Sequence, residues 1–150
     1  MLRNVANIVS PSDISSLAVI QYAVEVLQVT DIIVAGHYGC GGVRAAVTKY
    51  NHGPLEAWLS KLRRIRHKHA ESFSHLTSVE DQANLLVEIN VKEQVFNVAS
   101  TPFVQQAWKD GRELMIHGVV YDMMTGRLVD LHLTMHSIEQ LPDELAVFEK

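Results

Sequence analysis

The sequence predicts an α/β protein whose mostly parallel sheet is flanked by helices, with an antiparallel strand at its C-terminal edge. A short apolar run over residues 31–36, rich in β-branched side chains and closed by a glycine, is typical of a strand buried on both faces of a parallel sheet. Several segments after this run space their apolar residues as a helix does. Two late strand patterns joined by a short turn indicate antiparallel neighbours. Together these observations favour the α/β class.

The N-terminal part of the chain predicts a strand end, a helix and a strand. Residues 1–8 resemble the end of a buried strand because they hold several small and β-branched side chains. Residues 11–13 offer a turn and a helix cap, and residues 14–28 carry apolar side chains at helical spacing. The buried strand over 31–36 comes next, and a helix over 43–49 follows it.

The rest of the chain predicts four helices and two strands. Pro54 begins an amphipathic helix, because apolar residues at 55, 58, 59, 62 and 65 fall on one stripe. Ser78 caps a helix over 79–100, and Pro102 suits the first turn of the next one. The remaining elements are strands over 113–121 and 127–135, joined by a turn over 123–126, and a last helix over 141–150.

Composition bounds the class of protein. With 150 residues, 47% hydrophobic and 20% charged, the chain has the apolar material of one folded domain, 1–150, rather than of a disordered segment. The net charge of −4 argues against nucleic acid as a partner. No apolar run reaches the ~18 residues of a membrane span. A single cysteine and the lack of a signal-peptide pattern favour a cytoplasmic protein.

The loop after the predicted strand over 31–36 carries the candidate chemistry. His37 and Cys40 stand three positions apart, and a turning chain brings side chains at this spacing toward one point. Imidazole nitrogen and thiolate sulfur are good zinc ligands. Gly39, Gly41 and Gly42 remove bulk, and the first backbone N–H groups of the next helix suit an anion. Metal ligands and anion donors would then share one pocket.

Other interpretations of these residues remain open. Cys40 fits the pattern of a small buried hydrophobe, and His37 that of a side chain bonded to backbone. A phosphate-cradling loop is disfavoured because the glycine order of a dinucleotide site and the lysine of a P-loop are absent. The basic run over 61–68 is expected to be a solvated helix face rather than a nucleic-acid patch. Surface or structural roles are expected for the other histidines: His52, His67, His69, His75, His117, His132 and His136.

Gly36-His37-Tyr38-Gly39-Cys40-Gly41-Gly42-Val43 closely resembles the second zinc motif of the β-class carbonic anhydrases. Arg3-Asn4-Val5-Ala6-Asn7 is similar to the arginine–asparagine segment that lies upstream of that motif in the family. The resemblance extends over essentially the whole chain, and the subclass resembles the bacterial type. It continues through Gln21-Tyr22-Ala23, Trp58, Asn90-Val91, Gln94-Val95, Trp108 and Ile116-His117-Gly118.

The resemblance implies a lyase that reversibly hydrates carbon dioxide to bicarbonate on one zinc per subunit. Carried over by motif, His37 and Cys40 would be zinc ligands, and the backbone N–H of Gly41 would bind bicarbonate. Arg3 and Tyr121 match a non-catalytic bicarbonate site that some members hold beside the zinc. Family members form dimers, often paired into tetramers, so the resemblance also implies a homodimer or tetramer.

The family's first motif, Cys-x-Asp-Ser-Arg, precedes the arginine–asparagine segment and is not found in these residues. The family's second thiolate ligand is therefore absent, and the first central strand, which carries it, is expected to be missing. Its loss would leave unpaired strand edges and a slot in the core. Two hypotheses follow: a truncated active carbonic anhydrase, or a non-catalytic dimerising or anion-binding relative. Zinc binding by these residues alone is expected to be weak, because catalytic zinc uses three protein ligands.

Overall fold

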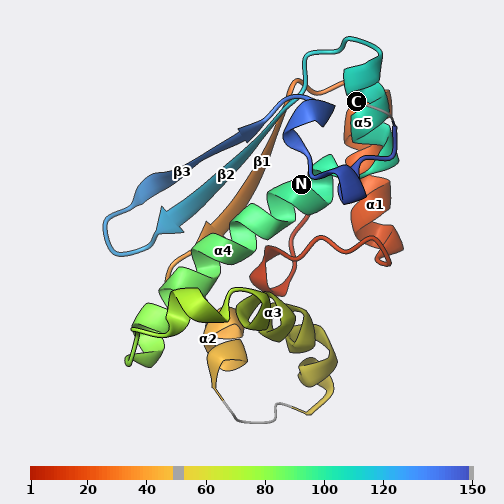
Figure 1. Cartoon of the computed structure of the whole chain (residues 1–150). Coiled ribbons are helices and arrows are strands. Elements are labelled where there is room, and N and C mark those ends of the chain that lie inside the picture. The colour runs from red at the N-terminus through yellow and green to blue at the C-terminus, as the bar shows by residue number, and fades with distance from the viewer. Residues whose placement is uncertain (49–52, 149–150) are drawn as a thin grey trace.

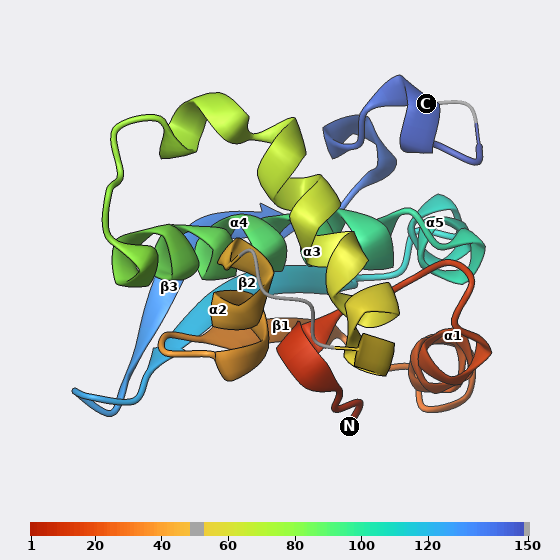
Figure 2. The ribbon, with the colours of Figure 1, turned by 90° about the horizontal axis from the view of Figure 1, so that it is seen from below.

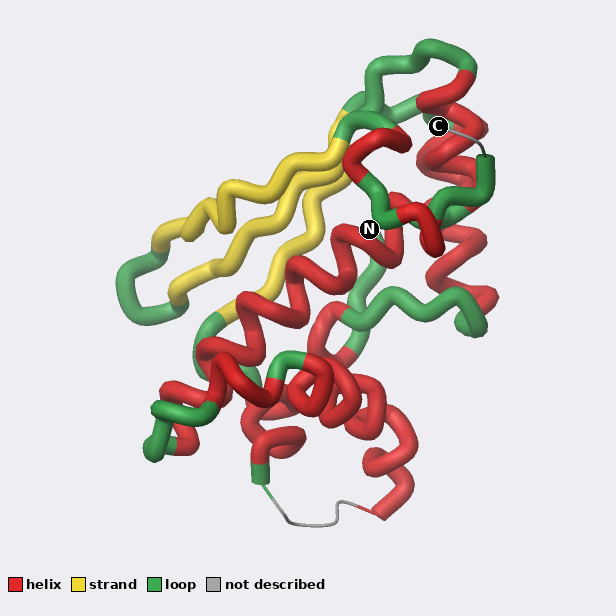
Figure 3. Tube along the Cα trace, viewed as in Figure 1, coloured by secondary structure: helices red, strands yellow, loops and turns green. Residues whose placement is uncertain are grey.

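A computed structural model describes residues 1–48 and 53–148, in which three strands form one sheet (Figures 1 and 3). β1 (Asp31–His37) pairs in parallel with β2 (Met115–Asp122), and β2 pairs in antiparallel fashion with β3 (Arg127–Met135). The strand order is β1-β2-β3, so β1 and β3 are the two edges. The predicted α/β class and the antiparallel C-terminal edge strand are confirmed, in a small mixed sheet.

The helices lie on one face of the sheet and at its ends. α4 packs along β1 and β2, while α2 and α3 gather near one end of α4 and α1 lies near the other (Figures 1 and 2). None of the described helices is long and apolar enough to cross a membrane. The helix bounds are α1 (Ile14–Gln21, continuing as a π-helical turn over Tyr22–Val26), α2 (Gly41–Val47), α3 (Glu56–Lys68), α4 (Val79–Ala99) and α5 (Pro102–Lys109).

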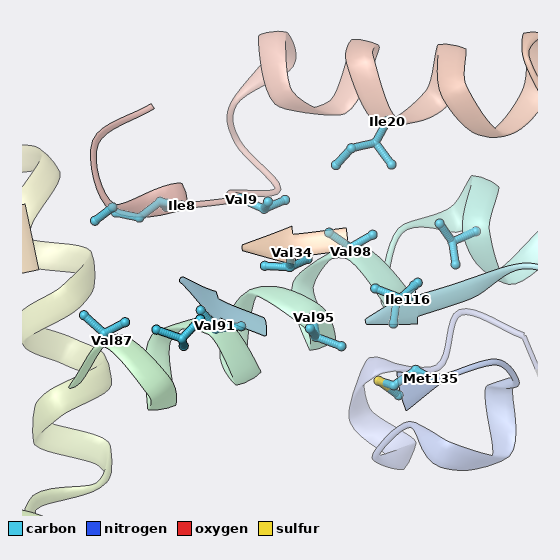
Figure 4. Close-up of a cluster of buried hydrophobic side chains, with 14 of the residues drawn as sticks. Ile8, Val9, Ile20, Val34, Val87, Val91, Val95, Val98, Ile116 and Met135 are labelled. Carbon is cyan, nitrogen blue, oxygen red and sulfur yellow. The ribbon is translucent and has the colours of Figure 1, made fainter. Parts of the chain in front are cut away.

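α4 is the helix on which the sheet rests. Ser78 caps it as predicted, because its hydroxyl accepts hydrogen bonds from the backbone N–H groups of Glu80 and Asp81 at 3.1 and 3.2 Å. Val87, Val91 and Val95 are buried along the helix beneath the strands (Figure 4). The absence of a side chain at position 36 of β1 permits this close packing, because a Cβ there would lie 2.7 Å from Cγ2 of Val91.

The N-terminal segment, residues 1–9, is not a strand, so the predicted strand end at the N-terminus is wrong. Val5–Asn7 forms a 3-10 turn in which Ala6 and Asn7 adopt left-handed backbone conformations, with φ of 61° and 44°. Ile8 and Val9 are nevertheless buried. Side-chain amides of α4 replace a neighbouring strand: Gln94 accepts from the N–H of Val9 at 2.8 Å, and Asn90 and Asn97 donate to the carbonyls of Ala6 and Val9 at 2.9 and 3.0 Å.

Two further predictions are wrong in part. β1 is buried on one face only, because Val34 and Gly36 are buried whereas Ile33 keeps 65% of its surface exposed. The expected last helix is replaced over the described residues by 3-10 turns at Ile138–Gln140 and Asp143–Leu145. Pro142 stands between these turns and has no backbone N–H to continue a helix.

Candidate metal centre at the end of strand β1

The candidate loop lies at the carboxyl end of β1, where ligand sites of α/β sheets are found. His37 is the last residue of β1 and is paired with Tyr121 of β2. The N–H of Tyr38 donates to the carbonyl of Tyr121 at 3.1 Å, so the sheet extends one residue into the loop. Gly39 then turns the chain with a φ of 70°, and Cys40 is the N-cap residue of α2. The two predicted zinc ligands thus flank one short turn, His37 at the end of β1 and Cys40 at the start of α2.

Two hydrogen bonds hold this loop against α4. The hydroxyl of Tyr38 donates to Oε1 of Glu88 at 2.6 Å, and the N–H of Gly39 donates to Oδ1 of Asn84 at 3.4 Å. Burial, together with the bond to Glu88, raises the pKa of Tyr38 to about 12. The phenol therefore keeps its proton and remains a donor at neutral pH. This anchor was not predicted from the sequence, in which Tyr38 was only one member of the motif.

The imidazole of His37 is oriented by a backbone bond. Its Nδ1 lies 3.0 Å from the carbonyl oxygen of Tyr38, which can only accept, so the proton of the neutral ring lies on Nδ1. The lone pair is then on Nε2. A carbonyl acceptor on one ring nitrogen is the usual second partner of a histidine that binds a metal through the other.

Cys40 and the glycines after it differ in their surroundings. Cys40 is buried and has a free thiol. A Cβ on Gly42 would lie 2.6 Å from Cγ1 of Val5, so position 42 must be small for the N-terminal segment to pack on α2. A Cβ on Gly41 would meet no atom within 4 Å. The backbone N–H of Gly41 lies in the first turn of α2 and so has no acceptor within the helix.

The donor atoms of this loop are of the kinds that bind zinc, but there are too few of them for a catalytic site. Imidazole Nε2 and a cysteine sulfur are preferred zinc ligands, whereas a catalytic zinc site uses three protein ligands and one open position. Over residues 1–48 and 53–148, no group of three or more histidine, cysteine, aspartate or glutamate side chains could hold a metal ion. The described part of the chain is thus one ligand short.

Among the described residues, no further histidine lies in a cluster with His37 and Cys40 that could hold a metal ion. His69 contacts Glu93 at 2.9 Å, and His117 bridges Asp31 and Thr134 at 3.0 and 3.1 Å. Surface or structural roles remain the prediction for these histidines. His132 lies 3.6 Å from Asp130, the exposed ones are His67, His75, His132 and His136, and His52 lies outside the described residues.

The two residues of the predicted bicarbonate site lie in different surroundings. Arg3 is exposed on the N-terminal segment. Tyr121 is 43% exposed, and its hydroxyl lies 4.0 Å from the place a Cβ on Gly126 would take, near the turn between β2 and β3. No hydrogen bond between described residues joins Arg3 to Tyr121. This site stays a prediction.

A cavity of about 630 Å³ separates the N-terminal segment from β1. Its walls are formed by the N-terminal segment, by β1, by residues 19–23 of the α1 region and by Val98 of α4. His37 is among the lining residues and Cys40 is not. We call this cavity the edge groove. It lies where the sequence predicted a slot in the core.

Comparison with known proteins identifies the family. A family model described as carbonic anhydrase matches residues 1–128. A carbonic anhydrase of Emericella nidulans is 39% identical over 136 residues, which cover 91% of this chain and 60% of that protein. A carbonic anhydrase of Candida albicans is 37% identical, over 93% of this chain and 50% of that protein. The chain therefore spans only about half to three fifths of the length of these relatives.

Solved structures agree with the sequence matches. The Coccomyxa β-carbonic anhydrase in complex with acetazolamide superposes with a TM-score of 0.87 at 36% identity, over 96% of this chain and 67% of that one. Tetrameric β-carbonic anhydrases of Sordaria macrospora give a TM-score of 0.84 at 34% identity, over 89% of this chain and 68% of that one. By sequence, by fold and by the loop at the end of β1, the chain belongs to the β-class carbonic anhydrase family.

Proposed function

We propose that this chain contributes two zinc ligands, His37 and Cys40, to a site that reversibly hydrates carbon dioxide to bicarbonate. The observation that carries the proposal is the orientation of His37, whose Nδ1 is bonded to the carbonyl of Tyr38 so that Nε2 is available, three positions before a free cysteine. Zinc, when bound, is a Lewis acid that makes hydroxide available near neutral pH. The third protein ligand would come from outside the described residues.

The chain's own residues would position the ligands and the product. Tyr38 and Gly39, bonded to α4, keep the loop from moving away from the sheet, so the two ligands need little ordering when metal arrives. The N–H of Gly41 has no acceptor within α2 and would donate to an oxygen of bicarbonate. The residues that would position the ligands and those that would bind bicarbonate thus lie just before α2 or at its first position.

Assembly and location complete the proposal. The Sordaria macrospora relatives are tetrameric, and we expect this chain to form a homodimer or a tetramer. The cytoplasm remains the predicted location, although one matching relative is named as mitochondrial. Relatives from fungi and bacteria match at similar identity, so the bacterial subtype also remains a prediction.

The metal content of the purified 150-residue chain tests the ligand assignment. We expect less than one zinc per chain after dialysis against a mild chelator, because two protein ligands hold zinc weakly. Cys40→Ser should remove the residual zinc, and the matched control His75→Gln, which changes an exposed histidine, should retain it. Cobalt in place of zinc adds a thiolate charge-transfer band that only a bound cysteine produces. Unchanged metal content in Cys40→Ser would reject the assignment.

A second candidate, a non-catalytic anion-binding relative, is favoured by the ligand count among the described residues. Stopped-flow hydration of carbon dioxide separates the two. Chain that holds zinc and accelerates hydration supports the enzyme, whereas zinc-loaded chain that leaves the solution rate unchanged supports the non-catalytic relative.

A further inference from the structure

The basic run over residues 61–68 divides into two sets on α3. Arg63 and Arg66 turn back onto the protein: Arg63 donates to two backbone carbonyls at the end of α2 at 2.6 and 2.7 Å, and Arg66 donates to Oε1 of Gln82 at 2.7 Å. The other three cations are spaced three and four positions apart, so they share one face of α3. They are Lys61, Arg64 and Lys68.

This face of α3 borders a second cavity, of about 280 Å³, which we call the α3 pocket. It lies between α3, α4 and residues 8–11 (Figure 2 shows α3 lying across α4). All three cations line it, and Ile8, Pro11 and Ile65 give it apolar walls. Neither candidate zinc ligand is part of the lining. The α3 pocket thus combines positive charge with apolar surface, away from the metal centre.

The positive charge of the α3 pocket is compensated only in part. Lys68 donates to Oε1 of Glu93 at 2.8 Å, so these two charges cancel. Lys61 lies over the ring of Trp58, with its Nζ 4.4 Å from the ring centroid, which holds the ammonium without neutralising it. Arg64 is exposed and makes no hydrogen bond or ion pair with another described residue. Two of the three cations are therefore available to a ligand.

Two carboxylates decide where an anion fits. Glu93 lines the α3 pocket beside Lys68 and repels an anion there. A hydrogen bond from a serine hydroxyl of α1 and, to a smaller extent, the charge of Lys61 lower the pKa of Asp13, but Asp13 does not line the pocket. An anionic group therefore belongs beside Lys61 and Arg64.

A doubly charged oxyanion matches these two cations. Lys61 and Arg64 are three positions apart, ~4.5 Å along the helix axis, so both side chains can reach one group. A guanidinium forms paired hydrogen bonds with the oxygens of a phosphate. A phosphate monoester carries about −1.5 to −2 charges at neutral pH, whereas a carboxylate or a sulfate ester carries one.

We propose that the α3 pocket binds a small organic phosphate monoester, with the phosphate between Lys61 and Arg64 and the apolar part against Ile8 and Ile65. The buried hydroxyl of Ser10 also lines the pocket and would donate to a phosphate oxygen. The volume of about 280 Å³ is near the lower limit of the ~300–1,000 Å³ typical of small-ligand pockets, so the ligand is small. Binding of this kind needs no metal and is independent of the proposed function.

Other ligands fit the α3 pocket less well. A nucleic acid needs a broad basic surface, but Arg63 and Arg66 of the same run are bonded within the protein and the chain carries a net charge of −4. An uncharged apolar molecule would leave the charge of Arg64 without a partner. A phosphate monoester with an apolar part uses both the cations and the apolar walls.

Phenyl phosphate tests the proposal on the metal-free chain, in which no zinc competes for the probe. Nuclear magnetic resonance of the backbone amides reports where the probe binds. We expect saturable shifts over residues 61–68 at millimolar probe, and no shift at Gly41, whose N–H is the other candidate anion donor. Phenyl sulfate has the same shape and one charge, and inorganic phosphate lacks the ring, so each should bind about tenfold more weakly. Shifts at Gly41 without shifts over 61–68, or equal affinity for either control, would overturn the proposal.

Matched charge variants test the geometry. Arg64→Gln should weaken binding of phenyl phosphate about tenfold and leave stability unchanged, because Arg64 has no partner among the described residues. Arg127→Gln removes an exposed arginine of β3 that does not line the α3 pocket, so it should bind as the unchanged chain does. Glu93→Gln removes the opposing carboxylate and frees Lys68, so it should bind the probe several-fold more tightly. Equal losses in the two arginine variants, or weaker binding by a folded Glu93→Gln chain, would refute the proposal.

Discussion

Gly36 of β1 offers the sharpest test of how the sheet rests on α4. In Gly36→Ala the new Cβ would lie 2.7 Å from Cγ2 of Val91 and 3.2 Å from Cγ1 of Val87. Ordinary carbon–carbon contacts are ~3.5–4.0 Å, so strand and helix must separate by about 1 Å. Both valines are buried, and α4 is tied to the N-terminal segment by Asn90 and Gln94, so neither side moves freely.

The expected cost follows from overpacking. An added methyl group in a packed core costs ~1–3 kcal/mol, and the lower chain entropy of alanine returns roughly 0.5 kcal/mol. We therefore expect Gly36→Ala to lower the free energy of unfolding by about 1–2 kcal/mol, out of the ~5–15 kcal/mol typical of a domain. Urea unfolding followed by circular dichroism measures this loss as a lower midpoint with an unchanged slope.

Combining Gly36→Ala with Val91→Ala decides whether the contact with Val91 causes the loss of stability. If it does, the double variant should be more stable than the sum of the single losses predicts, by at least about 0.5 kcal/mol. Gly41→Ala is the matched control, because its Cβ meets no atom within 4 Å and alanine favours a helix, so it should be neutral or stabilising by about 0.4–1 kcal/mol. Additive losses, or a Gly36→Ala chain as stable as the original, would refute this reasoning.

Three other predictions concern charged and titratable groups. The pKa of Tyr38, raised to about 12, adds stability that is complete below pH 10 and lost as the pH rises through 12, so Tyr38→Phe should show a shallower loss of stability over that range in alkaline unfolding. Burial alone would raise the pKa of Glu93, but hydrogen bonds from Lys68 and His69 leave it lowered. Its contribution is present above pH 4.5 and lost on acidification, so Glu93→Gln should flatten the acid limb of the stability curve. Arg63 donates to Glu56 and to the carbonyls of Ala46 and Thr48 at 2.6 to 2.7 Å; Arg63→Met should cost about 2 kcal/mol in urea unfolding, and Arg63→Lys should recover only part of it.

Local sequence patterns predicted most of the fold because they depend on residues close together in the chain. Ser78 at the start of α4 and the turn over 123–126 act within a few positions, and both lie where they were expected. The prediction of a strand in the N-terminal segment was wrong. Its apolar residues fit a strand, but its hydrogen-bond partners lie on α4, more than 80 positions away. Asn90, Gln94 and Asn97 on an otherwise apolar helix face were the signal that could have revealed this.

The candidate site was predictable only in part. The spacing of His37 and Cys40 predicted that both candidate ligands lie close together along the chain between β1 and α2, and the structure has His37 at the end of β1 and Cys40 at the N-cap of α2. The position of the edge groove could be predicted from the expected absence of a strand, but the polar groups around it could not. The buried Nδ2 of Asn7 and the bond from Tyr38 to Glu88 depend on three-dimensional neighbours that spacing alone cannot specify.

The carboxamides of α4 make the N-terminal segment tolerant of some changes and intolerant of others. The hydrogen bonds from Gln94, Asn90 and Asn97 to the segment all involve main-chain atoms of Ala6 and Val9, so these bonds depend on the path of the segment and not on its side chains. Substitutions of similar volume at Val9 should therefore leave these hydrogen bonds intact. A single inserted residue between Ala6 and Val9 would shift the peptide groups out of register with fixed positions on the helix, and deletions would do the same. Homologues should accordingly keep the number of residues in this segment.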